Sequence, residues 1–194
     1  MYYLKKALIG LVYLVFAGLM AYAILFIPNL EWLKIILLAL NLGLYCYVLG
    51  ATSYQDGQAA YKVRLANDLK RKQIILTGED IPIDRKREYK AYKGVIIGAI
   101  ICVPLVVLLI LNLILTNTNY DLGATASFLY LFVYAFAGVG VQVDNLFTVV
   151  SPYWALLAIP IIVAVDGLFF YLGGRKIELQ QEMIKEKHRM LHGE

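Results

Sequence analysis

The chain has 194 residues, of which 61% are hydrophobic and 16% are charged, and its formal net charge is +4. Because a soluble domain averages roughly 25% charged and about 45–50% apolar residues, this composition excludes an ordinary water-soluble globular domain. The apolar residues are grouped in blocks long enough to cross a hydrocarbon core of ~30 Å. The sequence therefore predicts an all-α integral membrane protein with four transmembrane helices, one short re-entrant or interfacial apolar helix and helical cytoplasmic extensions.

Residues 1–50 predict a transmembrane hairpin. The first apolar block, 7–27, contains no charged residue and follows two lysines. It begins like a signal peptide, but its apolar core of about 20 residues exceeds the usual ~7–15, so we expect a retained helix. The second block, 33–50, comes after the short connection 28–32, which can only join two antiparallel neighbours.

Residues 51–93 predict a cytoplasmic helical hairpin. The stretch up to Lys72 favours a helix, with apolar residues at steps of three and four. Gly78 and Pro82 interrupt that pattern and mark the tip of the hairpin. Asp84 follows as a suitable N-cap for a returning helix that leads directly into the next span.

Residues 94–172 form the second predicted transmembrane region, with spans at 94–115 and 154–172. Each of these spans contains a proline, which removes one backbone donor and bends a helix. The segment 128–141 lies between them, and as a helix it rises only ~21 Å, less than the thickness of the core. We therefore expect 128–141 to be re-entrant or to lie at the membrane interface.

The distribution of basic residues predicts the orientation. Of the 18 Lys and Arg residues, ten lie in 51–93, five follow Gly174 and two precede the first span. The positive-inside rule then places the N-terminus, the central loop and the C-terminus in the cytoplasm, which requires an even number of crossings. The alternative of five crossings would put the basic tail outside. With no N-x-S/T sequon in the sequence, this asymmetry favours a bacterial plasma membrane with anionic headgroups.

Residues 173–194 predict a cytoplasmic amphipathic tail helix. Apolar residues recur along it seven apart and form one seam on a charged helix. The partner of this seam is either the face of Ala59, Val63 and Ala66, which would complete a small three-helix bundle, or a second protein. The seam consists of Ile177, Met183, Ile184, Met190 and Leu191.

Asp166 is the most informative single residue, because it places a carboxylate inside the last predicted span. Such a group usually faces the interior of a helix bundle or water. Asn41 in the second span, with Tyr45 one turn away, is its expected partner. We interpret this cluster either as an ion or proton site or as a structural hydrogen-bond clamp between helices.

Two further patterns carry predictions about packing and access. Gly94, Gly98 and Cys102 put small residues at every fourth position of one span, which lets two helices approach closely, either within the chain or between copies. The polar residues that follow the short apolar segment 128–141 form either an outward-facing vestibule, if that segment is re-entrant, or an external loop after an interfacial helix. They are Gln142, Asp144 and Asn145.

The sequence contains no constellation typical of catalysis. It has no nucleophile elbow, phosphate-binding glycine loop, CxxC pair or nucleic-acid-binding motif, and His188 and His192 lack the further ligands of a metal site. We therefore expect no enzyme, cofactor, metal or nucleic-acid partner. The sequence favours a non-enzymatic subunit or scaffold of a larger membrane complex, with a protein partner or a second copy bound through its helices. The alternative is a small ion or proton channel or transporter with Asp166 in the pathway.

Overall fold

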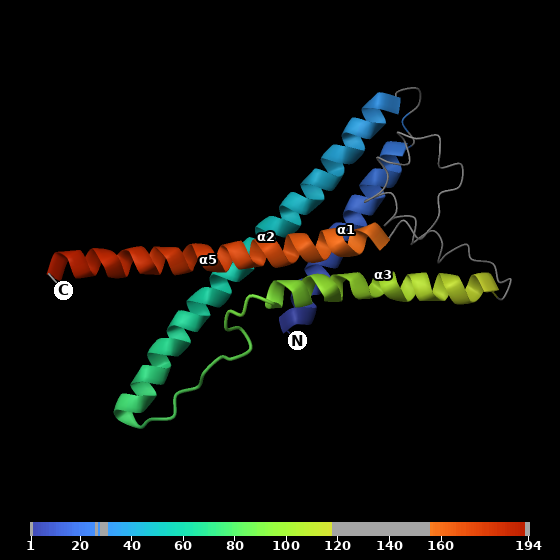
Figure 1. Ribbon diagram of the computed structural model, residues 1–194. Helices are drawn as coiled ribbons and strands as arrows, with labels where there is room; N and C mark the ends of the chain where they lie inside the picture. Colours follow the sequence, from blue (N-terminus) through green and yellow to red (C-terminus); the bar gives the residue numbers. More distant parts are fainter. Residues whose placement is uncertain (1, 26, 28–30, 118–155, 193–194) are drawn as a thin grey trace.

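The computed structural model describes residues 2–25, 27, 31–117 and 156–192, and in this part of the chain it is all-helical, without strands (Figure 1). All four described helices are long and apolar enough to cross a membrane. This confirms the prediction of an all-helical fold in the described residues and fits a multi-pass membrane protein. The helices are α1 (Tyr2–Leu25), α2 (Glu31–Thr77), α3 (Lys93–Asn117) and α5 (Ala158–His192).

The helices run in alternating directions. Along α1 and α2, Asn41 contacts Ala17 whereas Asp56 contacts Lys6, so these two helices are antiparallel. The same holds for α3 and α5, because a step from Gly94 to Gly98 moves the contact from Phe170 back to Val163.

This alternation brings three basic regions of the chain to one end of the bundle. The ammonium of Lys93, at the start of α3, lies 5.7 Å from the centre of the Tyr3 ring of α1. The ammonium of Lys176 in α5 lies 5.8 Å from the Tyr54 ring of α2. We call this end of the bundle, marked by Lys5, Lys6, Lys93, Arg175 and Lys176, the basic end.

The contact between α2 and α5 depends on glycines. A Cβ atom at Gly57 would overlap the carbonyl oxygen of Phe170, and one at Gly173 would overlap the carbonyl oxygen of Tyr54. The two helices therefore touch backbone to backbone where they cross, as Figure 1 shows. Any side chain larger than hydrogen at these two positions would separate the helices.

The contact between α3 and α5 uses the predicted small residues. A Cβ atom at Gly94 would lie 2.6 Å from Cβ of Phe170, and one at Gly98 would lie 3.0 Å from Cα of Val163. Cys102 is buried one turn further along, in the hydrophobic core of the bundle. The partner of this face is thus α5 of the same chain.

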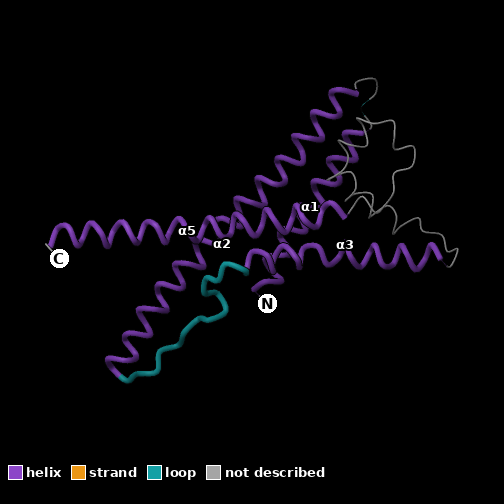
Figure 2. Tube along the Cα trace, viewed as in Figure 1, coloured by secondary structure: helices purple, strands orange, loops and turns teal. Residues whose placement is uncertain are grey.

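The central segment departs from the predicted hairpin in its second arm. Helix α2 continues far beyond its apolar part to Thr77 and ends at Gly78, whose φ of 70° is readily adopted only by glycine. Residues 78–92, however, contain turns and no helix, and they run back along α2 to the start of α3 (Figure 2). The predicted returning helix is wrong.

Side chains explain why this connection is not helical, because they bind the backbone groups that a helix would use. Asn67 of α2 exchanges two hydrogen bonds with the backbone of Asp84, at 3.0 and 3.3 Å. The ammonium of Lys93 donates to the carbonyl oxygens of Lys86 and Glu88. The backbone N–H of Tyr89 donates to the carbonyl oxygen of Ala60 at 3.1 Å. Tertiary hydrogen bonds thus replace the local ones.

Beyond Ile177, the tail seam does not pack on α2 within the described residues. Ile177 is 8% exposed, but the other four seam residues are 53–74% exposed, and Ala59 and Ala66 are exposed as well. Beyond their crossing point the two helices diverge (Figure 1). Of the two partners considered for the seam, the intramolecular one is therefore wrong.

Candidate functional site

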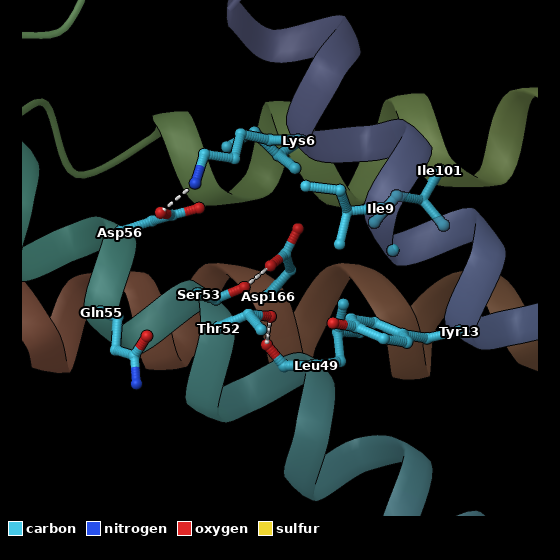
Figure 3. A pocket seen from close by; sticks show the side chains of 12 residues that line it. Lys6, Ile9, Tyr13, Leu49, Thr52, Ser53, Gln55, Asp56, Ile101 and Asp166 are labelled. Atoms are coloured by element: carbon cyan, nitrogen blue, oxygen red, sulfur yellow. Dashed lines mark hydrogen bonds and ion pairs between the residues drawn. The ribbon is translucent and has the colours of Figure 1, made fainter.

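A polar cavity of about 180 Å³ lies near the basic end of the bundle. Side chains of all four helices line it, and most of its polar groups come from α2 (Figure 3). Its apolar walls are formed by residues of α1, α2 and α3. The lining residues are Lys6, Ile9, Gly10, Tyr13, Leu49, Thr52, Ser53, Gln55, Asp56, Ile97, Ile101 and Asp166.

Asp166 is the buried acidic group of this cavity, with an exposed fraction of 1%. Its Oδ1 accepts a hydrogen bond from the hydroxyl of Ser53. Its Oδ2 is equally buried but has no hydrogen-bond partner in the described part of the chain. Figure 3 shows this carboxylate between Ser53 of α2 and the side chain of Lys6 on α1. One half of the carboxylate is therefore bound, and the other half can receive a proton or a ligand.

The glycines of α3 produce the burial of Asp166. A Cβ atom at Gly98 would lie 3.2 Å from Cβ of Asp166, and one at Gly94 would lie 2.8 Å from its carbonyl oxygen. The backbone of α3 therefore covers the acid directly. A larger residue at either position would move α3 away and let the carboxylate be reached from that side.

An ion pair lies at the basic end of the cavity. The ammonium of Lys6 is 2.5 Å from Oδ1 of Asp56, and these side chains are only 31% and 17% exposed. Because Lys6 belongs to α1 and Asp56 to α2, the pair joins two helices across the cavity (Figure 3). Movement of α1 relative to α2 would require this pair to break.

In the predicted cluster of Asp166, Asn41 and Tyr45, the contact between Asp166 and Asn41 is wrong. Asn41 donates to the carbonyl oxygen of Ala17 at 2.8 Å, so its side-chain amide joins α2 to α1. Asn41 and Tyr45 both line a separate, largely apolar groove of about 400 Å³ between these two helices. The partner of Asp166 is Ser53 instead.

Sequence reasoning missed Ser53 because it compared depths along straight, parallel spans. Ser53 lies 12 residues after Asn41, which is ~18 Å along a helix. Since α2 and α5 cross at Gly57 and Gly173, α2 reaches Asp166 only near that crossing. The pair of Lys6 and Asp56 was also missed, although a base before the first span and an acid just after the second were visible signals.

Among the residues that the structure describes, the remaining predicted site residues do not line this cavity. Beyond Ile177, the tail seam is exposed on the part of α5 that extends away from the bundle. Gln142, Asp144 and Asn145, together with the segment 128–141, lie outside the described residues.

Metal binding is not indicated in the described part of the chain, where no three His, Cys, Asp or Glu side chains are grouped to hold an ion. Comparison with known protein families, curated proteins and solved structures finds no match to the chain. The chemistry of the cavity therefore has to be argued from its own residues, which are one buried carboxylate, neighbouring hydroxyls and an interhelical ion pair.

Proposed function

We propose that this protein is a small membrane channel or transporter for protons, in which Asp166 takes up the proton. The observation that carries the proposal is the buried carboxylate of Asp166, whose Oδ2 has no partner in the described residues while Oδ1 is bound to Ser53. A buried polar group of this kind usually has a ligand or an exchangeable proton.

The energetics favour a proton over a metal cation. An isolated carboxylate in an apolar interior is strongly destabilised, so it is neutralised by a proton or by a bound cation. A single proton neutralises Asp166 without any further ligand, whereas hard cations such as Ca²⁺ take six to eight oxygen ligands. The cavity of about 180 Å³ also has room for a few water molecules that could carry protons to it.

The ion pair of Lys6 and Asp56 supplies a barrier in this mechanism. The pair lines the cavity at the basic end of the bundle, with the ammonium of Lys6 2.5 Å from Oδ1 of Asp56. Breaking it would let water from that end reach Asp166.

The proposal includes the orientation expected from the charges. The basic end faces the cytoplasm of a bacterial cell, so the distal part of α2 and the tail of α5 are cytoplasmic extensions. The common position of Lys6, Lys93 and Lys176 at one end supports this orientation. The segment 128–141 remains predicted as re-entrant or interfacial.

Proton flux into liposomes tests the function. Purified protein is reconstituted with an internal pH dye, and flux is driven by a pH gradient. We expect flux in the wild type, and a loss of at least tenfold in Asp166→Asn, which mimics the protonated acid but cannot release a proton. Asp68→Asn is the matched control, because Asp68 lies in α2 beyond the bundle and is 46% exposed. Wild-type flux no greater than that of empty liposomes, or full flux in Asp166→Asn, would refute the proposal.

A second function, a non-enzymatic subunit of a larger membrane complex, is favoured by the exposed tail seam. Met183, Ile184, Met190 and Leu191 are 53–74% exposed on a helix that extends away from the bundle. An apolar stripe of this kind on a charged helix is typical of a surface that a partner protein or a second copy covers.

Purification in mild detergent from native membranes tests this second function. A stoichiometric partner or a dimer should be retained by the wild type and lost from Ile184→Ser/Leu191→Ser. Lys185→Gln/Glu186→Gln, on the same helix, should retain it. A monomeric wild type without a partner would contradict this function and would leave the flux experiment unaffected.

A further inference from the structure

A second cavity, of about 500 Å³, lies beside the first at the basic end. It is formed by the start of α1, the middle of α2 and the connection that follows α2. The two cavities share Lys6, Ile9 and Asp56, which line both. The residues that line the second cavity are Tyr2, Lys5, Lys6, Ile9, Asp56, Ala59, Ala60, Val63 and Arg87.

The lining of this second cavity is divided into a cationic and an apolar part. Lys5, Lys6 and Arg87 supply three positive charges against the one carboxylate of Asp56. Arg87 is engaged only loosely, since its Nε lies 3.7 Å from Oδ2 of Asp84 and its side chain is 65% exposed. With Asp84 counted beside Asp56, the cavity keeps an excess of one positive charge.

The apolar part lies deeper along α1. Ile9 follows Lys5 by one helical turn, about 6 Å toward the membrane-spanning part of the helix. Ala60 and Val63 of α2 line the opposite end of the cavity, because α2 is antiparallel to α1 and both residues follow Asp56. A ligand that fits this cavity must carry a negative charge at one end and apolar groups at the other.

We propose that this cavity binds the phosphate group of an anionic phospholipid, with the glycerol and first acyl carbons against Ile9. Lysine ammonium and arginine guanidinium groups are the usual ligands of a phosphate, and basic pockets at the ends of transmembrane helices bind anionic headgroups. The cavity lies where α1 would enter the membrane, so a lipid reaches it by lateral diffusion. This proposal depends on the membrane location and is independent of proton uptake by Asp166.

A bound phosphate competes with Asp56 for Lys6. Lys6 is the cation that both cavities share, and its ammonium is already paired with Asp56 at 2.5 Å. Lys5 and Arg87 would hold the phosphate on the other side. The lipid therefore weakens the link between α1 and α2 when it binds.

Binding of spin-labelled phosphatidylglycerol and phosphatidylcholine to the detergent-purified protein tests the proposal. We expect the anionic lipid to bind more tightly than the zwitterionic one, and Lys5→Gln/Arg87→Gln to weaken its binding by about thirtyfold. The matched control is Lys62→Gln/Arg85→Gln, which also removes two positive charges. Lys62 lies in α2 and Arg85 in the connection that contains Arg87, but neither residue lines the cavity. Equal weakening by both double variants would overturn the proposal, because it would show a diffuse attraction to surface charge.

Because the phosphate and Asp56 compete for Lys6, a change at Asp56 should strengthen lipid binding instead of weakening it. Asp56→Asn should tighten binding of phosphatidylglycerol by up to about fivefold, because Lys6 is released to the phosphate. Asp68→Asn changes the net charge equally and should leave binding within twofold of wild type. Weaker binding in Asp56→Asn, with an unchanged elution profile and helix content, would contradict the proposal.

A third measurement distinguishes a lipid from a free anion. Soluble glycerol phosphate and inorganic phosphate are added as competitors to the spin-labelled lipid. We expect neither to displace it at concentrations a hundredfold above that of the lipid. Displacement by either at equal concentration would overturn the assignment to a lipid.

Discussion

The two sides of α2 are packed in different ways. Toward α5, Gly57 and Gly173 bring the two backbones into direct contact. Toward α1, contact is made by side chains around three cavities of about 180, 400 and 500 Å³. We infer that α2, α3 and α5 form the rigid part of the bundle and that α1 is the helix whose contacts leave room for ligands.

This difference indicates which helix contacts in a small helical membrane protein can hold polar or ligand-binding groups. Without a hydrophobic effect between lipid-embedded helices, close packing of small residues is the main source of stability. The glycine contacts supply that stability on one side. The α1 side is then free to contain polar groups. It holds the ion pair of Lys6 and Asp56 and the oxygen of Asp166 that has no partner among the described residues.

The largest loss in the free energy of unfolding is expected from a substitution of Gly57, where α2 crosses α5. Gly57→Ala places a Cβ atom against the carbonyl oxygen of Phe170, so the helices must separate, at a cost of about 3 kcal/mol. Gly43→Ala is the matched control on the same helix, because no atom lies within 4 Å of its added Cβ. That control should be neutral or stabilising by about 0.5–1 kcal/mol. Reversible unfolding in mixed micelles measures both; similar values would show that the crossing is not tightly packed.

A smaller loss is expected for the hydrogen bond between α1 and α2. Asn41→Leu removes the 2.8 Å bond to the carbonyl oxygen of Ala17 and should cost about 0.6–1 kcal/mol in the same unfolding assay. Leu40→Ala serves as the control, since Leu40 is 63% exposed on the neighbouring face. A loss in Asn41→Leu as large as that in Gly57→Ala would contradict the view that α1 is held more weakly.

The ion pair of Lys6 and Asp56 should contribute less again. A double-mutant cycle with Lys6→Gln and Asp56→Asn is expected to give a coupling energy of about 0.5–1 kcal/mol, reduced by added salt because the pair is partly exposed. A coupling energy of zero at low salt would show that the pair does not hold α1 on α2.

The smallest effect on stability is expected from ionisation of Tyr89, which packs beside the contact between α2 and α5. Its ring stacks on Phe170 with centroids 5.6 Å apart, and burial raises the pKa of its phenol above the ordinary 10.0. The folded state therefore holds this proton more tightly, so the contribution of Tyr89 is complete below about pH 10 and is lost as pH rises through the higher folded pKa.

Limited proteolysis of the connection 78–92 between about pH 9 and about pH 11 measures this effect. The wild type should become more susceptible to cleavage as the phenol ionises, and Tyr89→Phe should show no such increase. An identical pH dependence in both proteins would assign the change to another group.

The amino-acid sequence by itself predicted the four described helices, including the continuation of α2 beyond its apolar part, and the close packing at Gly94 and Gly98. These features are local: an apolar block long enough for a span, or a repeat of small residues at helical spacing, determines them without reference to the rest of the chain. The burial of Asp166 also followed from local chemistry, because an acid inside an apolar span has to face other helices.

Tertiary structure alone decided which residues meet. The angle at which α2 crosses α5 gave Asp166 the partner Ser53 in place of Asn41. Hydrogen bonds from Asn67 and Lys93 kept the connection 78–92 in a non-helical conformation where its sequence suits a helix. The divergence of the two helices left the seam at Ile184 uncovered. Each of these outcomes depends on helix rotation and crossing angle, and these are determined by side chains that pack against each other from distant parts of the chain.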